Sequence, residues 1–244
     1  MRNTWTIFKR ESSSYFSQPT AYAIIFIFLL LSLGLAFTFG GFMRLGDANL
    51  EWPFFFWHPI LFMFLAPAVA MRLWTDEQRD GTIELLATMP VSLWSVISGK
   101  FLAAALVWLV ALALTFPIVI TVNYLGDPDN GAILSGYLGS FLVCASFLAV
   151  TMLVSACTRD QVVCLIVSIA VCIFMVLCGY DDLIRALAKL TNESTAELLV
   201  SIGVWDHYRG MVRGLFRFQD MVWFASVIIT CLLGTSAILA AKRA

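Results

Sequence analysis

The stretch that decides the fold is Tyr22–Met43, YAIIFIFLLLSLGLAFTFGGFM, which contains no charged residue. A helix of about 20 mostly apolar residues is long enough to cross the hydrocarbon core of a bilayer. The run is too long for the apolar part of a cleaved signal peptide, and no small-residue cleavage site follows it. It therefore predicts a membrane-spanning helix.

The composition of the whole chain agrees with a lipid environment. Of its 244 residues, 61% are hydrophobic and 13% are charged, and the mean hydropathy is +0.89. An average soluble domain has about 25% charged residues and cannot hide this much apolar surface from water. The net charge of −1 argues against a nucleic-acid partner. Composition thus excludes most soluble enzymes and nucleic-acid-binding proteins.

Five further apolar runs have spanning length, and they cover residues 54–74, 96–124, 133–157, 162–179 and 221–241. With 22–43 they predict an all-α fold, a single polytopic membrane domain over residues 1–244 with six transmembrane helices. Six spans place both termini on one side of the membrane. Lys and Arg are more frequent in the segments on that side, which predicts cytoplasmic termini. The connection over residues 180–220 is basic although this orientation places it outside, which argues against the assignment. Long loops, however, count less in this rule.

Residues 1–19 are polar but carry aromatic side chains at helical spacing. Four rings fall on one side of a helix, and neighbouring basic side chains are long enough to reach lipid phosphates. The segment predicts an interfacial helix on the cytoplasmic leaflet, ended by Pro19; the alternative is a disordered tail. The residues expected to matter in it are Trp5, Phe8, Lys9, Arg10, Glu11, Tyr15 and Phe16.

The outer connection over residues 180–220 is expected to be helical. Its apolar stretch Ala196–Trp205 is too short to span the membrane and suits a re-entrant or interfacial segment. Leu183–Leu190 upstream has an amphipathic pattern. The alternative is a plain soluble loop.

The connection Thr75–Pro90, TDEQRDGTIELLATMP, is the most informative inner segment. Thr75 and Gln78 have the spacing of a capping box, Gly81 permits a turn, and Thr82 can cap a second short helix. That helix would present an apolar face of Ile83, Leu85 and Leu86 and end before Pro90. The pattern favours a docking element, and the alternative is a capped loop that only turns the chain.

Polar residues in or near the spans are interpreted as structural. Arg72 and Lys100 lie at inner span ends, where they are expected to snorkel to the membrane surface. His58 is expected to cap a helix or line an interface, and Asp206–Arg209 to order the outer connection. The six cysteines lack the spacing of a metal site and are expected to be packing residues. Pro67 and Pro117 are expected to bend the second and third spans.

The string EQRDGTIELLATMP over Glu77–Pro90 resembles the E-x-x-x-G-T-x-E-x-L-x-x-x-P signature of type-2 ABC transporter permeases, with a slight departure in spacing at its leucines and proline. Within that family the chain is similar to the gliding-motility-type permeases. The similar strings are FKRE at Phe8–Glu11, SYFSQP at Ser14–Pro19, PAVAMR at Pro67–Arg72 and GKF at Gly99–Phe101, although Ser12 replaces the subgroup's usual leucine. The resemblance covers essentially the whole chain.

The resemblance implies a division of labour. Residues 75–90 would be a coupling helix seated in a cleft of a separate ATPase subunit, which would bind ATP and Mg²⁺. This chain has no phosphate-binding G-x-x-x-x-G-K-[ST] motif of its own and is expected to be non-catalytic, without a cofactor. The implied docking residues are Glu77, Arg79, Gly81, Thr82, Glu84, Leu85, Leu86 and Pro90.

The function that this implies is a permease subunit in the bacterial inner membrane, which couples ATP hydrolysis to export of a substrate. The alternative is mechanotransmission, in which the permease moves a periplasmic partner and no cargo crosses. The expected partners are a dimer of the ATPase, a second copy or a paralogue of the permease, membrane lipid and a periplasmic domain protein. An intramembrane enzyme is the weakest hypothesis, since no Ser–His–Asp set is visible.

Overall fold

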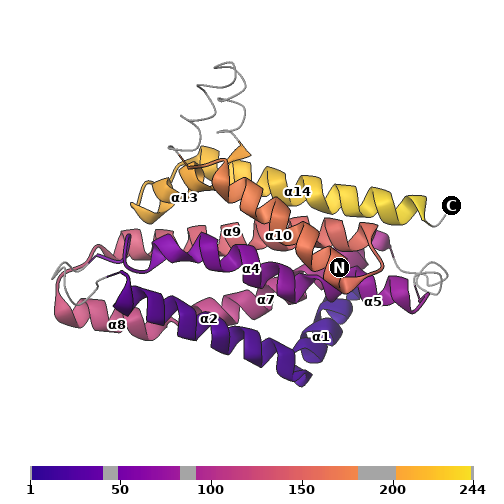
Figure 1. Cartoon of the computed structure of the whole chain (residues 1–244), viewed down its shortest axis with the longest axis horizontal. Helices are drawn as coiled ribbons and strands as arrows, with labels where there is room; N and C mark the ends of the chain where they lie inside the picture. The colour runs from indigo at the N-terminus through magenta and orange to yellow at the C-terminus, as the bar shows by residue number, and fades with distance from the viewer. Residues whose placement is uncertain (1, 41–48, 83–91, 181–201, 243–244) are drawn as a thin grey trace, which may run out of the picture.

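The computed structural model describes residues 2–40, 49–82, 92–180 and 202–242. Within these ranges all regular structure is helical, and most helices run along one axis (Figure 1). The helices are α1 (Arg2–Ser17), α2 (Pro19–Thr38), the short 3-10 helix η1 (Phe55–Trp57), α4 (His58–Ala70), α5 (Arg72–Arg79), α7 (Leu93–Ala113), α8 (Phe116–Leu125), α9 (Asn130–Cys157), α10 (Gln161–Leu177), α13 (Val204–Val212) and α14 (Phe218–Ala241).

Five helical stretches of the described chain are long and apolar enough to cross a membrane. They are Pro19–Thr38, Phe55–Arg79, Leu93–Leu125, Asn130–Cys157 and Phe218–Ala241. The remaining predicted span, 162–179, corresponds to α10, an apolar helix of 17 residues. The described part of the chain is therefore all-helical and contains several candidate membrane spans.

The helix ends follow from local sequence. Pro19 occupies the first turn of α2, where its missing N–H costs nothing, so α1 and α2 are separate helices as the proline predicted. Asp129 caps α9 by accepting hydrogen bonds from two backbone N–H groups at 2.9 and 3.2 Å. Asp160 caps α10 in the same way, at 2.8 and 3.4 Å.

Two prolines lie inside predicted spans, and they have different effects. The third span divides into α7 and α8 just before Pro117, where Thr115 turns its hydroxyl back to the Leu112 carbonyl at 2.6 Å. Pro67 instead lies within α4, which continues to Ala70.

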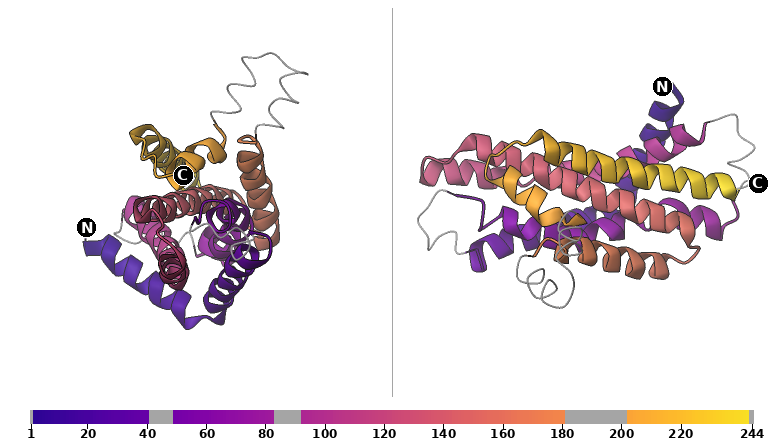
Figure 2. Two further views of the ribbon diagram at one scale, coloured as in Figure 1. Left: turned by 90° about the vertical axis from the view of Figure 1, so that its left-hand side faces the viewer. Right: turned by 90° about the horizontal axis from the view of Figure 1, so that it is seen from above.

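Helix α9 is the central element of the fold. In its most apolar window 72% of residues are buried, compared with 28% in α2 and 17% in α14. It packs against α4, α7, α13 and α14, which lie around it in both views of Figure 2. Its small polar residues point inward and are hydrogen-bonded; they are Ser135, Ser140, Ser146, Thr151 and Ser155.

The outer connection is described only in part. The amphipathic stretch Leu183–Leu190 and most of the apolar stretch Ala196–Trp205 lie outside the described residues. Residues Val204–Val212 form helix α13, whose side chains pack against α9.

Candidate coupling site around helix α5

Helix α5 contains the first residues of the predicted docking segment, Thr75–Arg79. It follows α4 after the single residue Met71, which has helical dihedral angles, and it ends at Arg79. The capping box predicted for Thr75 is wrong, because this residue lies inside α5 and donates its hydroxyl to the Met71 carbonyl at 2.6 Å. The turn predicted at Gly81 is confirmed by its φ of +70°, a conformation that favours glycine.

Seven of the eight predicted docking residues fall into two groups, and the eighth, Glu77, forms an ion pair with α7. Arg79 and Gly81 are exposed at the end of α5, and Thr82 is partly buried beside them. Glu84, Leu85, Leu86 and Pro90 lie outside the described residues. The structure therefore describes the base of the segment.

The side chain of Glu77 points into the protein and pairs with Lys100 of α7. Its Oε1 atom lies 2.7 Å from Lys100 Nζ, and the two side chains are 18% and 6% exposed. Lys100 also donates to the Leu73 carbonyl at 2.8 Å and lies 4.9 Å from the centre of the Trp74 ring. The expectation that Lys100 snorkels to the membrane surface is wrong, because this ion pair holds its ammonium inside the bundle.

Gln78 joins α5 to α9. Its side-chain amide donates to the carbonyls of Ser155 and Ala156, both at 2.9 Å. These carbonyls belong to the last turn of α9, where no further helical N–H is available to them. Gln78 therefore satisfies groups that the helix end leaves open.

Lys242 and Gln161 connect α5 to α14 and α10. Lys242, which caps α14, donates to Gln78 Oε1 at 2.7 Å and to the Ala156 carbonyl at 2.8 Å. Burial lowers the pKa of the Lys242 ammonium below its ordinary value. The side chain of Gln161 in α10 donates to Asp76 of α5. We call Asp76, Glu77, Gln78, Lys100, Gln161 and Lys242 the α5 polar cluster; it ties α5 to α7, α9, α10 and α14.

Residues Arg2–Ser17 form helix α1, so the helicity predicted for the N-terminal segment is observed, and α1 lies oblique to the long helices on the outside of the bundle (Figures 1 and 2). It packs against the start of α7, where Gly99 leaves room for it: a Cβ atom there would lie 2.9 Å from Ile7. Tyr15 donates to the Val69 carbonyl of α4 at 3.4 Å, and burial raises the pKa of its phenol.

The other residues predicted to matter in α1 are at least partly exposed. Trp5 is 66% exposed and stacks on Phe8 at 5.2 Å between ring centres. The remaining ones are exposed or partly buried: Lys9, Arg10, Glu11 and Phe16.

A second polar cluster occupies the opposite end of the bundle, where α4, α9 and α13 meet. His58 Nδ1 lies 2.7 Å from Ser140 Oγ, which lies 3.0 Å from the Tyr208 hydroxyl. Tyr208 donates to the Phe55 carbonyl at 2.8 Å. All three side chains are buried, and their hydrogen bonds join α4, α9 and α13 at this end of the bundle.

Two further side-chain contacts join the α13 region to its neighbours. His207 Nδ1 lies 2.7 Å from Asp220 Oδ1, and Arg213 lies 2.7 Å from Glu51. The hydrogen bond that Arg213 donates to the Glu51 carboxylate raises the pKa of the Arg213 guanidinium. Among the described residues no group of three His, Cys, Asp or Glu side chains has the arrangement of a metal site.

Sequence reasoning missed most of the α5 polar cluster. One signal was present for Lys100, since a charge placed within an apolar run requires a partner. No local pattern indicates that Gln78 bonds to residues 77 and 78 positions away in the chain. Such pairings depend on how the helices pack.

Comparison with known proteins agrees with this architecture. None of the curated proteins compared with the chain matches it. The family model described as ABC-2 family transporter protein matches residues 46–241, which is more than half of the chain. The chain thus belongs to the ABC-2 transporter family and is a multi-pass membrane permease subunit of an ABC transporter, a family whose members work with an ABC ATPase.

Proposed function

We propose that this permease couples ATP hydrolysis in a separate ATPase subunit to export across the bacterial inner membrane, through the segment Thr75–Pro90. The observation that carries the proposal is the α5 polar cluster. It joins the base of this segment to α7, α9, α10 and α14 by hydrogen bonds and an ion pair. A displacement of the segment would therefore move several helices together.

The proposed topology has six spans, with α10 as the fifth. At about 1.5 Å per residue, its 17 residues cover about 26 Å, near the lower limit for a span. The contacts of α5 with Gln161 and Lys242 support it, because they bring the α9–α10 loop and the end of α14 to the α5 side. Both termini are then cytoplasmic, with the outer connection in the periplasm.

This topology is tested by cysteine labelling from outside intact cells, in a background without the native cysteines. Pro128→Cys should react with a membrane-impermeant maleimide, and Arg243→Cys should react only after the cells are opened. Labelling of Arg243→Cys in intact cells would reverse the orientation.

In the proposed docking, Ile83, Leu85 and Leu86 fill an apolar cleft of the ATPase. Arg79 and Glu84 set the orientation at the rim by charge. Glu77 takes a different role from the one that the sequence suggested: paired with Lys100, it anchors the base of the segment. The interfacial helix α1 would lie on the cytoplasmic leaflet and contact the same subunit.

The coupling mechanism follows from linkage. If closed and open ATPase dimers bind the two permease states with different affinity, ATP shifts the permease between those states. Two ATPase subunits require two permeases, a second copy of this chain or a paralogue. Helices α4–α5 and α9 are bonded at both ends, through Gln78 at one and His58 at the other, so they transmit the movement as one unit.

The test separates binding from coupling in the permease–ATPase complex. Leu85→Arg should weaken ATPase association about tenfold or more, because a charge enters an apolar contact. Gln78→Leu should preserve association and reduce the stimulation of ATP hydrolysis by the permease. The matched control is Asp80→Asn, an exposed position at the end of α5. Unchanged association of Leu85→Arg would exclude the docking segment.

Mechanotransmission is the second candidate, and the second polar cluster, formed by His58, Ser140 and Tyr208, favours it. Ser140 of α9 contacts Tyr208 of α13, and Tyr208 donates to the Phe55 carbonyl beside α4. A movement of α4 and α9 would therefore reach the outer connection even if no substrate crossed the membrane. A photo-crosslinking residue at Phe216, which is 53% exposed, should then capture a periplasmic domain protein in intact cells. Absence of any protein adduct would favour export.

A further inference from the structure

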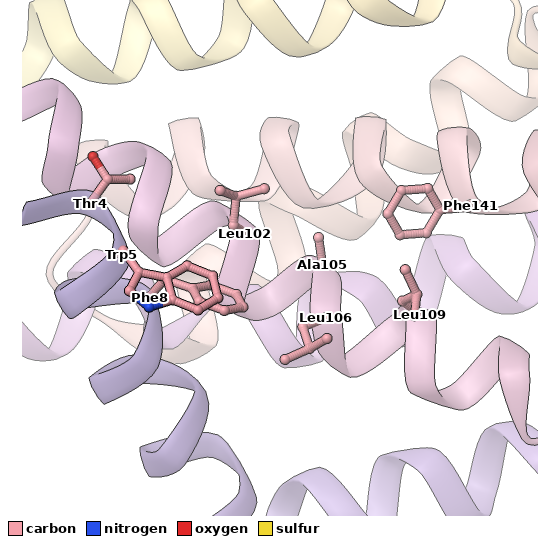
Figure 3. A pocket seen from close by; sticks show the side chains of 8 residues that line it. All are labelled: Thr4, Trp5, Phe8, Leu102, Ala105, Leu106, Leu109 and Phe141. Carbon is pink, nitrogen blue, oxygen red and sulfur yellow. The ribbon is translucent and has the colours of Figure 1, made fainter. Parts of the chain in front are cut away.

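An apolar groove follows α7 and α9 along the outside of the bundle. It has two parts, with volumes of about 590 and 800 Å³. Leu109 and Phe141 line both parts, so the two are continuous. In the first part, Trp5 and Phe8 of α1 lie at one end, and α7 side chains lead along it toward Phe141 (Figure 3).

The depth of the groove is comparable with that of a bilayer. Along α7 the first part extends from Leu102 to Leu109, a rise of about 10 Å, and along α9 the second part extends from Phe141 to Asn130, a rise of about 16 Å. Together they cover most of the ~30 Å of the hydrocarbon core, and the second part is close to the depth of one leaflet.

The polarity of the groove also follows that of a bilayer. Thr4 lines one end, and Asn130, whose amide bonds to Asn123 at 3.0 Å, lines the other. The side chains between these ends are almost all apolar. Trp5 is 66% exposed at the α1 end, a position that suits the interface with the headgroups.

We propose that this groove binds the acyl chains of phospholipids, one from each leaflet, with their ends meeting beside Leu109 and Phe141. The acyl chain at the α1 end would contact α1 and α7 together, and would therefore contribute to the contact between the interfacial helix and the third span. A second permease is the rival occupant. The polar ends and the depth of the groove favour lipid.

The test uses the full chain in nanodiscs that contain phosphatidylethanolamine with a diazirine in one acyl chain. After illumination, cross-linked residues are mapped by mass spectrometry. The expected result is that α7 and α9 residues of the groove carry at least threefold more label than the lipid-facing residues of α14. Equal labelling on α14 would overturn the proposal.

Two variants locate the site, and a matched control accompanies them. Leu109→Trp, at a residue 51% exposed, should reduce groove labelling at least threefold. Leu233→Trp on α14, at a residue 50% exposed, should leave it unchanged. Leu134→Trp, which narrows only the second part, should reduce labelling there and preserve it near Leu102.

Two further outcomes would refute the lipid assignment. One is unchanged labelling in Leu109→Trp. The other is an unlabelled groove combined with a shift of Leu109→Trp from dimer to monomer, which would assign the groove to a second copy. ATPase association is measured separately, so failure here leaves the docking proposal standing.

Discussion

Replacing Lys100 with methionine removes the cation from the buried pair with Glu77 and preserves most of the side-chain volume. The carboxylate of Glu77 is 18% exposed, and its Oε2 atom has no hydrogen-bond partner among the described residues. Without the ammonium 2.7 Å away, this carboxylate loses its partner in a poorly solvated place.

The expected cost is about 3–5 kcal/mol, the range for breaking a buried pair by removing one partner. Replacing both members costs much less than breaking the pair, because no uncompensated charge remains. Glu77→Gln combined with Lys100→Met should therefore recover about 1–3 kcal/mol relative to the sum of the single changes.

The assay is the free energy of unfolding in mixed micelles, followed by tryptophan fluorescence during an SDS titration. Arg10→Met is the control, since the Arg10–Glu11 pair is 3.3 Å long and the arginine side chain is 76% exposed. Exposed pairs of this kind contribute almost nothing measurable. A cost for Lys100→Met as small as that of the control, or strict additivity in the double variant, would refute the reasoning.

Three other substitutions test the packing of the bundle in the same assay. Tyr208→Phe removes a buried hydroxyl with two partners and should cost about 1–3 kcal/mol, whereas Tyr124→Phe, at a residue 91% exposed, should cost nothing measurable. Gly99→Ala should cost about 1–3 kcal/mol by pushing α1 away from α7, and Gly34→Ala, where a Cβ meets nothing within 4 Å, should be neutral or stabilising. Asp129→Ala removes the cap of α9 and should cost about 0.5–2 kcal/mol. Equal free energies of unfolding for a variant and its control would contradict these contacts. A free energy of unfolding of Asp129→Ala equal to that of the unsubstituted protein would contradict the cap.

Hydropathy predicted the helical elements well, because it depends on each segment and its solvent alone. The run at 22–43 corresponds to Pro19–Thr38, and the run at 133–157 corresponds to Asn130–Cys157. Proline was equally informative at residue 19, since the missing N–H acts locally. Helix ends moved by a few residues where caps such as Asp129 were not considered.

The predictions that failed depended on partners distant in the chain. Thr75 and Gln78 have the spacing of a capping box, yet α4 continues almost directly into α5, so neither stands at a helix start. Lys100 was expected to reach the membrane surface because its partner, Glu77, lies in another element. The pattern of residues along the sequence does not indicate which distant side chains will pair in the folded protein. The candidate site consists mainly of such pairs.

The central position of α9 has a consequence for how the protein is made. Helix α9 is long and apolar enough to cross a membrane. Helices α13 and α14, which cover it, follow it in the chain. Helices α4 and α7, which also pack against α9, precede it, so during synthesis the faces of α9 that await a protein partner are those that α13 and α14 cover. A chain stopped after Cys157 would leave the Ser135 hydroxyl without its partner, the Met211 carbonyl of α13, so the late helices complete the polar pairing of α9.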